Sequence, residues 1–111
     1  MEKAKVTFDY RKLQSSAELM RAVAHPLRLI ILEFIDKHGV INVNKIYNAL
    51  QIEQSITSQH LRILKLAGVV QSRREGKFIH YSINYDIIDR VDTAMRNFLN
   101  SEKEIKRTTG T

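Results

Sequence analysis

Residues 51–81 combine a short helix carrying small polar side chains with a basic segment built around a glycine. The helix is expected over residues 54–67, and Ser55, Ser58 and Gln59 fall on the face opposite its apolar residues. A glutamine can pair with adenine through both of its polar atoms, and a serine can bond to bases or to phosphates. This face is therefore either a surface that reads base edges or an ordinary solvated helix face.

Positive charge surrounds these polar residues. Residues 54–81 hold five Lys or Arg against one acid, Glu75, and the whole chain has a formal net charge of +6. Arg62 lies a turn beyond the serines and suits a phosphate contact. The basic residues around the glycine are Arg73, Arg74 and Lys77. They would contact the DNA backbone or an adjacent minor groove, unless they only protect an edge strand from aggregation.

Two further residues are candidates for binding DNA. Gln54 stands at the entrance of the helix, where it suits either a base or a phosphate. Arg28, early in the helix expected over residues 26–37, either holds a phosphate or forms a local ion pair with Glu33 or Asp36.

The sequence offers no chemistry of the catalytic or metal-binding kind. It has no cysteine, so thiolate metal sites, disulfides and thiol redox switches are excluded. The four histidines lack the short spacing of a metal site, such as His-x-x-x-His. No serine is placed where a histidine and an acid would converge on it. We therefore expect no metal, no cofactor and no catalytic site.

With 111 residues, the chain has the length of one domain with a small core, so burial against a second subunit would help. No apolar run reaches the ~18 residues needed to cross a bilayer, and the N-terminus does not read as a signal peptide. We expect a cytoplasmic protein with a flexible segment over residues 1–10, a folded domain over 11–101 and a flexible tail over 102–111.

Apolar residues at helical spacing predict helices over residues 13–24, 26–37, 43–50, 54–67 and 85–100. Pro26 suits the first turn of the second helix, Gly39 suits its end, and Asn42 can cap the third. Alternating β-branched residues predict strands over 69–73 and 77–83, joined by a turn at 74–76. Four helices, a hairpin and a last helix form the layout of a mainly α winged helix-turn-helix.

The last helix carries a wider apolar stripe than a small core needs. We hypothesise that it packs against the first helix and against the same two helices of a second subunit. The residues expected at this dimer interface are Leu13, Met20, Ile87, Val91, Met95 and Phe98.

Residues 19–84 resemble the ArsR/SmtB family of small bacterial repressors. The segments that carry the likeness are 22–32 (AVAHPLRLIIL), 54–61 (QSITSQHL), 64–70 (LKLAGVV), 73–77 (RREGK) and 81–84 (YSIN). The resemblance implies a homodimer joined through its first and last helices, paired recognition helices on a pseudo-palindromic operator, and repression of transcription. It also places His60 near the DNA, where it would make a supporting hydrogen bond.

The chain departs from the family at the sensor sites. Where many members place cysteines that bind metal or arsenite, it has Asn42 and Asn44, and amides are poor ligands for soft ions. The positions matching a zinc site between the last helices hold Tyr85, Ile87, Phe98 and Ser101. None of these is a good zinc ligand. Glu53, a weak N-cap, stands where many relatives have Ser.

The sequence thus predicts a homodimeric regulator without a metal sensor, whose partners are double-stranded operator DNA and a second copy of itself. The alternative is a winged-helix interaction module that docks a partner protein through its last helix. A third option is a repressor that responds to an unknown protein or to a small molecule bound between its subunits.

Overall fold

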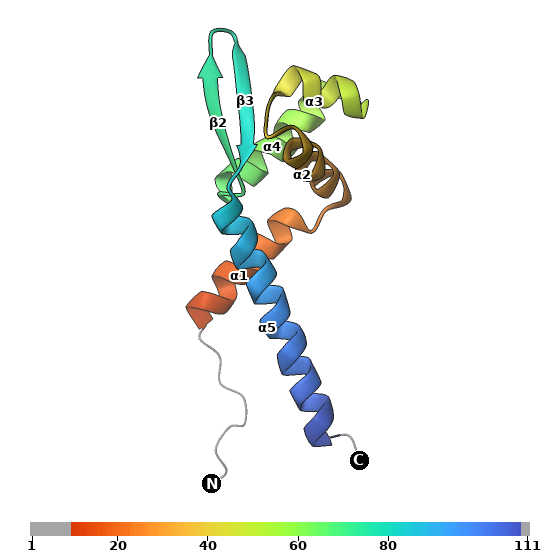
Figure 1. Cartoon of the computed structure of the whole chain (residues 1–111), viewed down its shortest axis with the longest axis vertical. Coiled ribbons are helices and arrows are strands. Elements are labelled where there is room, and N and C mark those ends of the chain that lie inside the picture. Colours follow the sequence, from red (N-terminus) through yellow and green to blue (C-terminus); the bar gives the residue numbers. More distant parts are fainter. Residues whose placement is uncertain (1–9, 110–111) are drawn as a thin grey trace.

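The computed structural model describes residues 10–109. Its elements follow one another as α1 (Tyr10–Val23), α2 (Pro26–His38), β1 (Val40–Asn42), α3 (Val43–Leu50), α4 (Gln54–Leu66), β2 (Val70–Glu75), β3 (Phe78–Ile83) and α5 (Tyr85–Thr109). Figure 1 shows α2, α3 and α4 gathered beside the hairpin of β2 and β3, while α5 extends away from them. This arrangement confirms the predicted winged helix-turn-helix.

α2 is the central helix of the core. Its buried side chains are Ile31, Leu32 and Ile35. Pro26 occupies the first turn, where its missing N–H has no partner to lose. The side chain of His25 accepts a hydrogen bond from the Leu27 N–H at 3.2 Å. Gly39 ends the helix with a φ of 76°, a conformation that glycine adopts without strain. Both ends of α2 therefore lie within one residue of the prediction.

α3 and α4 form the helix-turn-helix. Asn42 caps α3 as expected, because its Oδ1 accepts a hydrogen bond from the Lys45 N–H at 3.0 Å. Gln51, with a left-handed φ of 56°, then turns the chain toward α4. α4 begins at Gln54, and the Glu53 side chain makes no capping hydrogen bond. The strong cap of α3 and the weak cap of α4 both agree with what the residue types at positions 42 and 53 predicted.

The three strands form one antiparallel sheet in the order β1-β3-β2. The prediction was wrong on two points. It missed β1, which pairs with β3 in a register that sets Val40 opposite Ser82. It also placed the hairpin turn too early, since β2 continues to Glu75 and β3 begins at Phe78. Gly76, with a φ of 61°, supplies the turn.

α5 has 25 residues and is therefore about 37 Å long at 1.5 Å per residue. It begins at Tyr85 as predicted and ends at Thr109, nine residues beyond the expected end. α1 packs against α5 and also contacts α2 and α4 (Figure 1). Residues 1–9 of the expected flexible segment lie outside the described part of the chain. Within residues 10–109, no helix has the length and apolar character needed to cross a membrane.

Candidate nucleic-acid interface

α4 separates an inner apolar face from an outer polar face. On the inner face, Leu61 and Leu64 are fully buried, and so is Thr57, whose hydroxyl donates to the Glu53 carbonyl oxygen at 3.0 Å. The outer side chains are all exposed, namely those of Gln54, Ser55, Ser58, Gln59 and Arg62. Because the buried face fixes the rotation of the helix about its axis, the predicted base-reading residues face solvent together.

The wing, which we define as β2, β3 and the turn between them, carries the other predicted DNA contacts. Side chains alternate between the two faces of a sheet, and cross-strand partners share a face. Arg74 pairs with Ile79, on the same face as the buried Val70 and Ile83 near the base of the wing. Arg73 pairs with His80, on the opposite face. The two adjacent arginines therefore point in opposite directions.

Glu75 gives the opposite face of the wing a charge cluster that was not predicted from the sequence. Its carboxylate lies 2.6 Å from a terminal nitrogen of Arg73 and 3.6 Å from Nε2 of His80. Arg74 instead donates from Nε to the carbonyl oxygen of Gly76 at 3.3 Å. The ammonium of Lys77 lies 5.7 Å from the centre of the Phe78 ring. Only the strand register, which places Glu75 and Arg73 on one face, indicates the ion pair.

Arg28 contacts the protein rather than a carboxylate. Its Nε donates to Nδ1 of His60 at 3.2 Å. The alternative of a local ion pair with Glu33 or Asp36 is wrong, because Glu33 pairs with Lys37 at 3.3 Å. Asp36 accepts a hydrogen bond from the hydroxyl of Tyr85 at 2.5 Å. Arg28 thus connects α2 to α4 through His60, and it also donates to the Ala22 carbonyl oxygen at the end of α1.

His60 is half-buried beside the outer face of α4, where its Nδ1 accepts the hydrogen bond from Arg28. Its ring centre lies 4.7 Å from that of His25. Partial burial is the main cause that lowers the pKa of His60 below its usual 6.5, and the neighbouring His25 and Arg28 lower it further. A lowered pKa favours the neutral ring, in which Nδ1 can accept the hydrogen bond from Arg28.

The residues expected at the dimer interface differ in exposure within one chain. Met95 is 51% exposed, Met20 and Ile87 are half-buried, and Val91 is only 8% exposed. Val91 is therefore packed within its own subunit and has little surface left for another. The side chains of Leu13 and Phe98 lie outside the described part of the chain.

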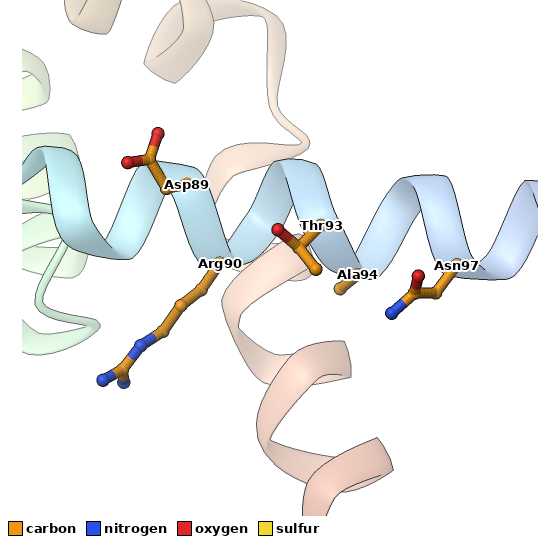
Figure 2. A pocket seen from close by; sticks show the side chains of 5 residues that line it. All are labelled: Asp89, Arg90, Thr93, Ala94 and Asn97. Atoms are coloured by element: carbon orange, nitrogen blue, oxygen red, sulfur yellow. The ribbon is translucent and has the colours of Figure 1, made fainter.

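α5 also carries a shallow groove of ≈310 Å³ that the sequence did not indicate. It is lined by Asp89, Arg90, Thr93, Ala94 and Asn97. Figure 2 shows Arg90, Thr93, Ala94 and Asn97 along one side of the helix, with α1 crossing nearby. The helical spacing of these residues could have revealed the shared side, but not the hollow. Among residues 10–109, no cluster of three or more His, Cys, Asp or Glu could hold a metal ion.

Known proteins are similar to this chain in sequence and in fold. A sequence profile described as "Bacterial regulatory protein, arsR family" matches residues 25–72. The transcriptional repressor PagR of Bacillus anthracis is 44% identical over 77 residues, which cover 68% of this chain and 76% of PagR. An uncharacterized HTH-type transcriptional regulator of Methanocaldococcus jannaschii, MJ1325, is 40% identical over 80 residues, covering 72% of this chain and 86% of that protein. The crystal structure of PagR superposes with a TM-score of 0.64 and 36% identity, covering 78% of this chain and 99% of PagR.

Proposed function

The chain belongs to the ArsR family of bacterial regulatory proteins, and from this membership we propose that it is a homodimer that binds double-stranded operator DNA and represses transcription. The observation that carries the proposal is the orientation of α4, whose apolar face is locked into the core while its polar face is exposed. A helix presented in this way fits the major groove of B-DNA. Nothing in the fold or in these relatives favours the alternative of a docking module for another protein.

Base reading is assigned to the outer face of α4. Gln59 can bond to adenine through both polar atoms, while Ser55 and Ser58 reach bases or phosphates. Arg62, a turn further along the exposed face, is positioned for the DNA backbone. Gln54 at the start of the helix adds a polar contact. These side chains are exposed and sit on a rigid helix, which is what direct readout of base edges requires.

The wing supplies positive charge next to α4. Arg74 and Lys77 make no ion pair with an acid among the described residues, so each can neutralise a phosphate. Arg73 is paired with Glu75 on the exposed surface. Such exposed pairs contribute only about 0–1 kcal/mol, so a phosphate can compete with Glu75 for Arg73. The wing therefore serves as the backbone contact that sets the position of α4.

Two subunits would join through α1 and α5, with Met95 and its apolar neighbours covered by the partner. A two-fold dimer reads a palindrome, and its half-sites would lie about one helical turn, ~34 Å, apart. The chain has no cysteine, so its effector would not be a metal ion bound by thiolates. A protein or a small molecule would take that role.

Selection of bound fragments from the source genome tests the proposal. We expect a few fragments to be enriched, each with an inverted repeat protected from cleavage over two half-sites. The matched control is the double variant Ser58→Ala, Gln59→Ala, which keeps every cation. It should bind unselected DNA as the wild type does but enrich no sequence. Equal enrichment by both proteins, or none by the wild type, would contradict the proposal.

A further inference from the structure

Arg28 joins its own helix, α2, to the preceding helix α1 and to α4, which lies further along the sequence. It belongs to the first turn of α2, and its Nε donates to Nδ1 of His60 on α4, 32 residues away. Its Nη1 donates to the carbonyl oxygen of Ala22 at 3.2 Å and to that of Arg21 at 3.5 Å, both in the last turn of α1. A single guanidinium thus bonds to the helix expected to form the dimer and to the helix expected to read DNA.

The contact with α1 satisfies groups that the helix leaves open. The last four carbonyl groups of a helix have no partner within it, and they attract positive charge. In α1 the Met20 carbonyl accepts from the Ala24 N–H and the Val23 carbonyl accepts from the His25 N–H, each at 2.8 Å. The two carbonyls between them are those that Arg28 contacts. Arg28 therefore completes the end of α1.

The contact with α4 places a condition on His60. An arginine has only donors, so Nδ1 of the ring must be an acceptor, and the proton of the neutral ring must be on Nε2. The charged groups that face the ring are Arg28 itself and, when protonated, His25. A proton on Nδ1 would remove the hydrogen bond and set two cations against each other. The link to α4 holds only while His60 is neutral.

From this geometry, and resting on the proposed function, we infer that Arg28 is a positioning residue that fixes the recognition helix α4 to the dimerisation helix α1 through His60. Its two bonded nitrogens face the protein, which favours this role over the phosphate contact suggested by the sequence. In a dimer, the angle between α1 and α4 sets the distance between the two recognition helices. Arg28 would then control how well both helices fit half-sites at a fixed spacing.

Two substitutions of Arg28 separate the two roles. Lysine keeps the charge and can still bind a phosphate, but its single amine cannot reproduce the fork that reaches both His60 and α1. Glutamine removes the charge. If Arg28 positions α4, both variants lose about tenfold or more in operator affinity, the order expected for hydrogen bonds to a charged group. The slope of log K against log salt should stay at the wild-type value in both. Lys37→Ala, which removes an exposed cation on the same helix, is the matched control.

The opposite pattern would overturn the inference. If Arg28→Lys binds the operator like the wild type while Arg28→Gln lowers the salt slope by ~1.8, which is ~0.9 for the phosphate lost in each subunit of the dimer, Arg28 is a phosphate contact. A wild type that binds no DNA at all would instead refute the proposed function.

Variants of His60 provide a second test. His60→Asn places an acceptor oxygen near the position of Nδ1 and should retain much more operator affinity than His60→Leu. Equal losses in these two variants would also count against the inference.

A measurement on the wild-type protein does not depend on the folding of any variant. Long-range ¹H–¹⁵N NMR spectra report which ring nitrogen of a histidine carries the proton. At pH 7.5 we expect His60 to be neutral, with the proton on Nε2 and Nδ1 accepting from Arg28. A proton on Nδ1 would overturn the inference directly.

Discussion

Arg73 and Arg74 are neighbours in the sequence but lie on opposite faces of the wing. Arg73 therefore meets Glu75 on one face, whereas Arg74 bonds to a backbone carbonyl at the tip. The two arginines carry the same charge, but within residues 10–109 only Arg73 is paired with an acid, so they should contribute differently to DNA binding. An acid placed among the cations of the wing lowers its positive charge and competes with phosphates for Arg73.

Glu75→Gln should consequently tighten DNA binding. The variant removes a negative charge from the interface and frees Arg73, so we expect an affinity increase of about two- to fivefold, the range of an exposed ion pair. Fluorescence anisotropy should show the increase for operator and unselected DNA alike, because phosphates carry no sequence information. Glu33→Gln on α2 has the same change of charge and should have no such effect. Weaker binding by Glu75→Gln would show that the carboxylate holds Arg73 in a productive position.

His60 makes stability depend on pH. Its folded-state pKa lies below 6.5, so the unfolded chain takes up this proton more readily than the folded chain does. Stability from this residue is complete above pH 6.5 and is lost as pH falls from there through the folded pKa. In thermal unfolding between pH 8 and 5, the wild type should lose more stability than His60→Asn, which does not titrate. Parallel curves for the two proteins would contradict this.

The ends of α2 and the start of α3 could be predicted from the sequence. Pro26 and Gly39 delimit α2, and Asn42 begins α3, because each acts on backbone groups within a few residues. β1 has only three residues, and its partner strand lies some 40 residues further on, so no local pattern indicates it. The bond between Arg28 and His60 likewise arises from the packing of α2 against α4. The outer face of α4 was predictable because helical spacing alone defines it.

The N-cap of α4 can be changed to stabilise the protein. Glu53 precedes the helix with a φ of −56° and a ψ of 140°, and its side chain makes no capping hydrogen bond. Aspartate is a strong N-cap, so Glu53→Asp should stabilise the protein by ~1 kcal/mol while keeping the charge unchanged. Thermal unfolding should show a melting temperature a few degrees higher. Glu33→Asp, in the middle of α2, is the control and should give no gain. An unchanged or lower melting temperature for Glu53→Asp would mean that the entry of α4 is already satisfied.

The length of α5 and the exposed apolar side chains along it favour packing against a second subunit. Met95 is 51% exposed on a helix that extends beyond the compact part of the chain (Figure 1). A charge at this position would be buried without a counterion in the dimer, so Met95→Glu should shift the protein toward monomers. Analytical ultracentrifugation at micromolar concentration measures this shift. Asn100→Glu, also on α5 but on a different face, should leave the dimer intact. A wild type that sediments as a monomer would refute the proposed assembly.

The affinity for a selected operator fragment as a function of salt tests DNA binding by α4 and the wing most directly. A dimer that neutralises six to ten phosphates should lose roughly 10³–10⁵ in affinity between 50 and 200 mM salt. Replacing Arg73, Arg74 and Lys77 with alanine should abolish binding to the fragment or reduce the slope. A wild-type affinity that stays constant over this range, or a triple variant with an unchanged slope, would contradict the assignment of this surface to DNA.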